Sequence, residues 1–170
     1  MDRRRERLAQ ALEETGLWRS AEPAHRLAQL DEIRSGGYPL DSAVFADVRF
    51  PANARLLAEG GVAKLLAEMA PALAEYGLRL RVRELTPTKV EINGTACLIR
   101  EEPTIEYAAT VRPLAVVNDL LQATGARVRI FTLYAGDAEG LAYLLDPRVL
   151  RALHASGLYD RRELPELAAV

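Results

Sequence analysis

The stretch that decides the fold is residues 89–99, KVEINGTACLI, which has the pattern of a tight β-hairpin. Residues 90–92 and 95–99 are mainly β-branched or apolar, and Asn93-Gly94 stands between them. A type I′ turn needs positive φ at both central residues, and Asn-Gly adopts that conformation at low cost. The sequence therefore predicts two antiparallel strands that are joined at Asn93-Gly94.

Alternation of apolar and polar residues extends the predicted sheet on both sides of this hairpin. It occurs before the hairpin, over residues 78–83, and after it, over residues 105–111. Residues 127–134 and 141–145 are a further pair of predicted strands around 136–140, a loop of glycine and acidic residues. We therefore expect an antiparallel sheet drawn from the middle and the C-terminal parts of the chain.

Helical periodicity with start and stop signals marks the helices. The predicted helices span residues 2–15, 22–34, 62–77, 113–124 and 146–157. Residues 38–50 are ambiguous, because alternation over 44–50 indicates a strand while Asp41-Ser42 could cap a short helix; we favour the strand. Beyond Leu158, a polar tail interrupted by proline is expected to fray.

These elements predict the α+β class, with a single domain in which one twisted antiparallel β-sheet is covered by helices. Residues 1–37 are expected to form an N-terminal helical hairpin that packs on an α+β body of residues 38–170. From residue 62 onward, the order helix, three strands, helix, two strands, helix is similar to that of small bacterial secretion-effector chaperones. This resemblance rests on element order and implies chaperone-like binding of another protein.

The composition is that of an ordinary globular protein, with 49% hydrophobic and 27% charged residues among 170. The formal net charge of -2 means that the molecule lacks the positive field that drives nonspecific nucleic-acid binding. No stretch has the pattern of a signal peptide or a membrane span, and a single cysteine excludes an internal disulfide. We expect a cytoplasmic protein, and its excess of arginine over lysine indicates a GC-rich bacterial genome.

The chain carries none of the common signatures of catalytic or cofactor sites. It lacks nucleotide-binding glycine loops, the HExxH and GxSxG motifs and EF-hand loops, and its two histidines lie too far apart in sequence for zinc-ligand spacing. We therefore expect no cofactor, no metal and no catalytic residue. Cys97 is expected to be a buried core residue, His154 a helix-terminal residue and His25 a surface residue.

Two sets of polar residues are the candidate binding residues. The first set contains arginines that would form one concentrated basic surface if they share an exposed sheet face: Arg79, Arg81, Arg83, Arg127 and Arg129. Such a face would attract an acidic partner, or it would form an ion-pair ladder with Glu91 and Glu106 that keeps the sheet soluble. The second is Asn118, at the edge of an apolar helix stripe, which is expected to bond a buried backbone group or, alternatively, to face a ligand pocket.

These observations lead to one functional hypothesis and two rivals. The leading hypothesis is a non-enzymatic cytoplasmic binding protein of chaperone, immunity or adaptor type, whose partner is another protein or a second copy in a homodimer. The first rival is a small enzyme with a carboxylate site built from Asp119, Asp137 and Glu139, although Asp137 and Glu139 also suit a hairpin loop. The second rival is a nucleic-acid-binding regulator that uses the arginines. No membrane partner is expected.

Overall fold

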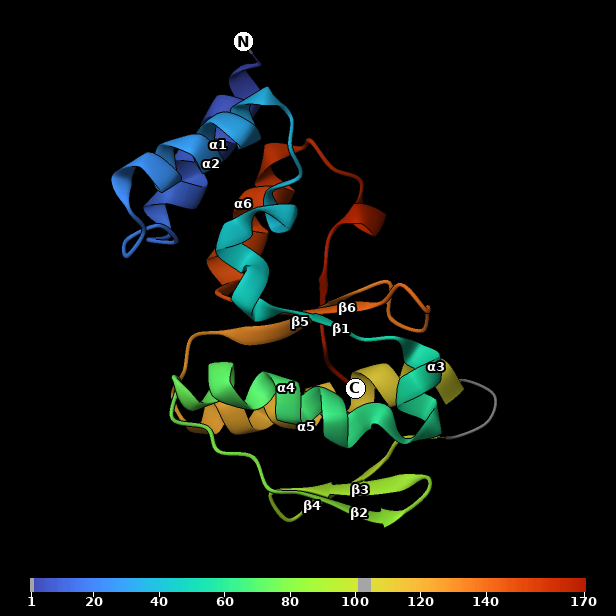
Figure 1. The fold of residues 1–170 in the computed structure, drawn as a ribbon. Coiled ribbons are helices and arrows are strands. Elements are labelled where there is room, and N and C mark those ends of the chain that lie inside the picture. Colours follow the sequence, from blue (N-terminus) through green and yellow to red (C-terminus); the bar gives the residue numbers. More distant parts are fainter. Residues whose placement is uncertain (1, 101–104) are drawn as a thin grey trace. The chain divides into compact units, whose positions relative to one another are not determined.

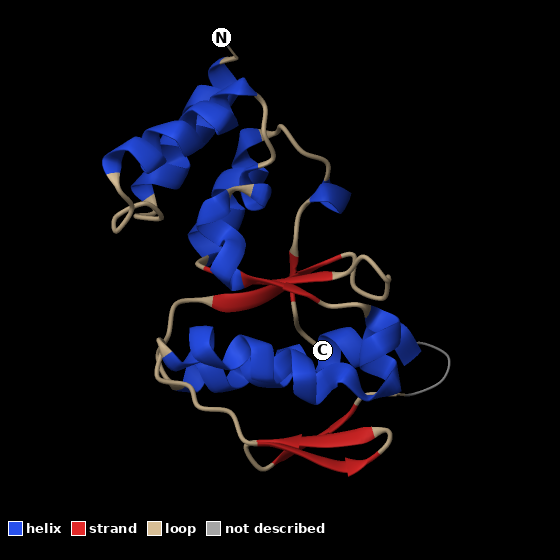
Figure 2. Cartoon of the chain, in the orientation of Figure 1, coloured by secondary structure: helices blue, strands red, loops and turns tan. Residues whose placement is uncertain are grey.

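Helices and antiparallel strands make up the chain, which a computed structural model describes over residues 2–100 and 105–170 (Figure 2). The predicted α+β class is therefore confirmed. Contacts group the chain into two compact units: residues 1–47 with 146–164, and residues 48–145 with 165–170. The predicted division of a single domain into residues 1–37 and 38–170 stays a prediction.

The first unit is helical in its described part. Its elements are α1 (Arg3–Glu14), α2 (Pro23–Ser35), α6 (Pro147–Ser156) and the 3₁₀ turns η1 (Pro39–Asp41), η2 (Ala43–Val48) and η4 (Arg161–Glu163). Helix α1 packs against both α2 and α6. Asp2 caps α1 and Asp146 caps α6, because each carboxylate accepts a 2.9 Å hydrogen bond from a backbone N–H of the first turn. The predicted N-terminal helix pair and the predicted last helix are confirmed.

The predicted strand over residues 38–50 is wrong for most of its length. Ser42 N–H donates to Pro39 C=O at 3.1 Å and Phe45 N–H donates to Ser42 C=O at 3.0 Å, which makes successive 3₁₀ turns. These local bonds use backbone groups that a strand would need for its neighbours. Only Arg49–Pro51 pairs as a strand, β1.

The described strands of the second unit form two antiparallel sheets instead of the single sheet expected. Besides β1 they are β2 (Val82–Thr86), β3 (Lys89–Ile92), β4 (Thr95–Leu98), β5 (Arg129–Leu133), β6 (Leu141–Leu145) and β7 (Glu166–Leu167). One sheet has the order β1-β6-β5-β7 and the other has the order β2-β3-β4. The strands predicted on either side of the loop 136–140 are confirmed as β5 and β6.

Helices lie between the two sheets of this unit, as Figure 1 shows for α4 and α5. The helical elements are α3 (Ala54–Leu56), the π-helical turn η3 (Leu57–Gly61), α4 (Val62–Ala74) and α5 (Ile105–Ala123). Helix α4 buries the apolar stripe on which its prediction rests: Val62, Leu65, Leu66, Met69 and Leu73. Apolar residues of α4, α5 and both sheets form one continuous core, because these helices lie between the two sheets and pack against both.

Helix α5 replaces two predicted elements, a strand over residues 105–111 and a helix over residues 113–124. It runs through Pro113 without ending, although proline removes one backbone donor. Residues 108–111 are all buried, which a helix enclosed between sheets permits and a half-exposed strand does not. The alternation of residue types in this stretch therefore reflects a helix that is buried on more than one side. No described helix, α5 included, is both long and apolar enough to cross a membrane.

The tail beyond Leu158 is ordered, and the prediction that it frays is wrong. Asp160 N–H donates to the Glu163 carboxylate at 2.7 Å at the start of η4, and β7 pairs with β5. Leu164 and Ala168 are buried. Burial of these apolar side chains offsets the conformational entropy lost when the tail becomes ordered.

The hairpin at Asn93-Gly94 forms as predicted. The φ angle is 50° at Asn93 and 85° at Gly94, and the register places Val90 opposite Cys97. Val90, Ile92 and Cys97 are buried, so this face of the three-stranded sheet packs on the core.

We predict that Gly94→Val lowers the free energy of unfolding by about 1 to 2 kcal/mol, because a β-branched residue must then adopt positive φ. Beyond its chain neighbours, no atom lies within 4 Å of a Cβ placed on Gly94, so the cost comes from the backbone and not from a clash. Urea denaturation measures this cost. Thr95→Val, at the exposed next position, is the control that should change stability little. Equal stability of Gly94→Val and the natural sequence would contradict the turn assignment.

Candidate binding surface along strand β2

Strand β2 is an edge strand, so one side of its backbone has no strand partner among the described residues. The strand begins at Val82, four residues later than the predicted start at Leu78. Asn93 N–H donates to Arg81 C=O at 2.9 Å, so the backbone groups of Arg81 face β3. Since these groups alternate in direction along an antiparallel ladder, those of Val82 and Glu84 face the open edge.

Residues 79–81 precede the ladder, and the side chain of Asn93 fixes them to the hairpin turn. Asn93 Oδ1 accepts a 2.6 Å hydrogen bond from Arg81 N–H, and Asn93 Nδ2 donates to Arg79 C=O at 3.0 Å. The sequence identified Asn93 as a turn residue, but it did not predict these two hydrogen bonds, which we call the Asn93 clamp. The available signal was that asparagine side chains in turns bond nearby backbone groups, but the sequence does not say which groups come near.

The side chains of Arg79, Arg81 and Arg83 are exposed and line one surface pocket. Arg83 forms a 3.1 Å ion pair with Glu91, with side chains that are 70% and 28% exposed. The side chains of Arg79 and Arg81 form no ion pair or hydrogen bond with the described residues. The predicted ion-pair ladder is therefore reduced to one pair, and Glu106 lies in α5 instead of on this sheet.

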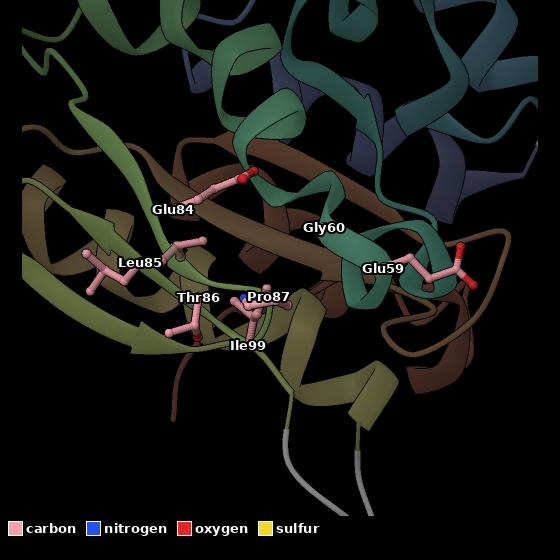
Figure 3. Close-up of a pocket in the computed structure, with 8 residues that line it drawn as sticks. Glu59, Gly60, Glu84, Leu85, Thr86, Pro87 and Ile99 are labelled. Carbon is pink, nitrogen blue, oxygen red and sulfur yellow. The ribbon is translucent and has the colours of Figure 1, made fainter.

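A second pocket, of about 500 Å³, opens beside the following half of the same strand (Figure 3). It is lined by Glu59, Gly60, Glu84, Leu85, Thr86, Pro87, Val90 and Ile99. Val90 and Ile99 are almost completely buried, so they give this Glu84 pocket an apolar floor. Glu59 is ion-paired with Arg55 at 3.1 Å, and its carboxylate points away from Glu84 in Figure 3. The Glu84 side chain has no ion-pair partner in the described part of the chain.

One wall of the Glu84 pocket is the turn η3, which forms a kink between α3 and α4. Gly60 in this turn has a φ of 109°, in the left-handed region that favours glycine. The two pockets thus follow each other along one edge strand, arginines first and Glu84 second. We call residues 79–87 with their two pockets the β2 edge surface.

Arg127 and Arg129 do not join this surface, because they belong to the connection before β5 and to β5 itself, in the other sheet. Arg129 donates from its guanidinium to Ala126 C=O at 2.6 Å and to Val128 C=O at 2.7 Å. Arg127 is exposed. The condition that all five arginines share one sheet face is therefore not met, since Arg83 and Arg129 belong to strands of different sheets.

Asn118 is a structural residue, which confirms the expectation that it bonds buried backbone. Its Oδ1 accepts from Ile130 N–H at 2.7 Å, and its Nδ2 donates to Ile130 C=O and to Ala168 C=O, each at 2.9 Å. The amide is therefore fully used, and Asn118 lines neither of the two pockets along β2.

The remaining candidate residues lie in separate elements. Cys97 is buried as predicted, and desolvation raises the pKa of its thiol although the charge of Arg112 acts in the opposite direction. Within the described residues, no three histidine, cysteine or acidic side chains gather as metal ligands would. Asp119 lies in α5, while Asp137 and Glu139 lie in the loop between β5 and β6. Asp137 N–H donates to Tyr134 C=O at 3.1 Å, as the hairpin-loop interpretation requires.

Comparison of this chain with protein families, with curated proteins and with solved structures finds no match. From α4 to α6, the described elements follow the order helix, three strands, helix, two strands, helix. The resemblance of this order to secretion-effector chaperones stays a prediction, since none of these comparisons supports it.

We predict that Asn93→Gly keeps the turn, because glycine adopts positive φ, but frees residues 79–81 from the hairpin. Amide exchange at Arg81 should become about fivefold faster, since one net hydrogen bond contributes about 1 kcal/mol. Hydrogen exchange followed by NMR measures this rate, and Leu66 inside α4 is the internal control. Unchanged protection at Arg81 would mean that Asn93 does not hold this segment.

We predict that Asn118→Leu lowers the free energy of unfolding by roughly 2 to 6 kcal/mol. The change removes all three hydrogen bonds of the Asn118 amide. Ile130 C=O keeps the hydrogen bond that Ala168 N–H donates to it at 3.1 Å. The cost therefore comes from two groups, Ile130 N–H and Ala168 C=O, and each loss costs about 1 to 3 kcal/mol. Gln122→Leu, at an exposed position of the same helix, is the matched control. Thermal and urea unfolding measure the free energy of unfolding of both variants. A loss below about 1 kcal/mol for Asn118→Leu would contradict the role of these hydrogen bonds in stability.

Proposed function

We propose that this chain is a non-enzymatic cytoplasmic protein-binding module, and that an extended acidic segment of a partner protein adds to the open edge of β2. The β2 edge surface carries this proposal. Backbone groups of Val82 and Glu84 face the open edge, beside two guanidiniums, Arg79 and Arg81, that have no partner among the described residues. In strand addition, main-chain hydrogen bonds supply affinity and side chains supply selectivity.

The edge is held in an extended form before any partner arrives. Its ladder with β3 fixes residues 82–86, and Asn93 fixes residues 79–81. A preorganised edge loses little conformational entropy on binding, so more of each new hydrogen bond appears as affinity. The arginines then favour acidic side chains, because guanidinium and carboxylate groups form charge-assisted hydrogen bonds.

The same arginines disfavour pairing of this edge with a second copy of itself. In a symmetric antiparallel pair, the guanidiniums of the two copies would meet across the new ladder, and like charges placed opposite each other are destabilising. Charged side chains on an edge strand also protect it from aggregation. A different protein therefore fits this surface better than a homodimer does.

A nucleic acid also fits this surface less well than an acidic protein segment does. Residues 79–98 contain no aromatic side chain on which a base could stack. Two carboxylates of this surface would repel phosphates: Glu91, which pairs with Arg83, and Glu84, which stands on the other face of β2. A protein segment can place a cation beside each carboxylate, whereas a phosphate backbone cannot.

We predict that Arg79→Glu with Arg81→Glu weakens binding of an acidic extended peptide at least tenfold, while the free energy of unfolding changes by less than about 0.5 kcal/mol. Neither guanidinium has a partner within the described residues, so the change removes no such contact of the folded chain. The probe is the fluorescein-labelled peptide TEVEVET, and anisotropy with the full chain gives the affinity. The uncharged peptide TQVQVQT should bind more weakly to the natural protein.

The matched control is Arg151→Glu with Arg162→Glu, which reverses two exposed arginines that belong to the first unit. It gives the same change in net charge and should leave peptide binding nearly unchanged. Equal affinity of both double variants for TEVEVET would contradict the proposal. Binding of a single-stranded oligonucleotide with a steep salt dependence, without binding of the peptide, would identify the nucleic-acid function instead.

A further inference from the structure

The two faces of β2 present different chemistry to an added strand. Glu84 stands in register with Val90, whose side chain is buried, so Glu84 is on the helix side of the sheet. Arg83 stands in register with Glu91 and belongs to the opposite face. In Figure 3, the side chains of Glu84 and Leu85 point in different directions from the strand. A strand that pairs with β2 therefore meets carboxylate on one face and guanidinium on the other.

The Glu84 pocket has the features that a long cationic side chain requires. Val90 and Ile99 supply an apolar floor, and Leu85 and Pro87 add apolar lining, which suits the methylene stem of lysine or arginine. Glu84 supplies a carboxylate with no ion-pair partner in the described part of the chain. A purely apolar side chain would bring no charge to this carboxylate, and an acidic side chain would be repelled by it.

We propose that the Glu84 pocket receives a lysine or arginine of the segment that adds to β2, and that this contact fixes the direction and register of the segment. The inference rests on the proposed strand addition and names the residues that the segment carries. The ammonium or guanidinium group pairs with Glu84 while its stem covers the apolar floor.

The register converts this contact into a sequence pattern. Opposite residues of paired strands share a face, and antiparallel pairing is the form found on both sides of β3. In the added segment, the basic residue lies opposite Glu84 and the next residue lies opposite Arg83. The residue two positions after that one lies opposite Arg81. The preferred segment therefore reads basic, acidic, any residue, acidic, with the basic residue at the N-terminal end.

The experiment compares three labelled peptides on the full natural chain by fluorescence anisotropy. The first, TVKEVEVET, carries the predicted pattern; the second, TVTEVEVET, lacks the lysine; the third, TEVEVEKVT, is the first in reverse order. We expect the first to bind about fivefold more tightly than either of the others, the size expected for an ion pair of up to 1 kcal/mol. The third peptide has the composition of the first, so net charge alone cannot produce that difference.

The assignment to Glu84 is tested with Glu84→Gln, which keeps the size of the side chain and removes its charge. In this variant the first and second peptides should bind equally, while Glu68→Gln, an exposed position of α4, should keep the fivefold difference. Equal binding of the first and third peptides to the natural chain, or a difference that persists in Glu84→Gln, would overturn the pocket assignment and leave strand addition standing. Failure of all three acidic peptides to bind would overturn the proposed function together with this inference.

Discussion

The second unit depends on the amide of Asn118, which joins a helix both to the strand that follows it and to the C-terminal segment 50 residues later. The backbone groups of a helix are used within the helix, so α5 has none to offer a strand. The buried amide of Asn118 supplies them: it bonds both backbone groups of Ile130 in β5 and the carbonyl of Ala168 next to β7. Because α5 also packs against β3 and β4, its position determines where both sheets can form around it. Apolar packing alone would leave this position less well defined, since it has no direction.

The layered arrangement of this unit explains why an edge strand carries the candidate surface. Helices cover one face of the three-stranded sheet, and β2 and β4 end it on either side. An uncovered edge invites unwanted pairing, and charged side chains are one ordinary protection against it. Arg79, Arg81 and Glu84 provide charge of both signs along β2. In the proposed function, the same side chains provide this protection and select the partner. A segment of complementary charge is attracted by them, whereas other strands are repelled.

The candidate surface combines a backbone edge that is open for pairing with side chains that carry charge. Asn93 and the ladder with β3 hold residues 79–86 extended, which prepares the backbone for pairing with any strand. In the proposed function, the arginines and Glu84 discriminate among strands by charge, and such discrimination depends on repulsion of wrong partners as much as on attraction of the right one.

Features that depend on neighbouring residues were determined by the sequence itself. The Asn93-Gly94 turn, the Asp146 cap of α6 and the buried stripe of α4 follow from local conformational preference and periodicity, so they could be predicted without the fold. The tertiary structure decided the features that depend on which faces become covered. Residues 105–111 alternate as a strand would, but they form the first turns of α5, and pairing with β5 orders a tail whose composition is polar. The candidate site shows the same division: exposed arginines at residues 79–83 could be predicted, whereas the Asn93 clamp, the Glu84 pocket and the separation from Arg127 and Arg129 could not. Those features arise where segments distant in sequence meet, and the sequence alone does not specify which segments do so, because apolar attraction is non-directional.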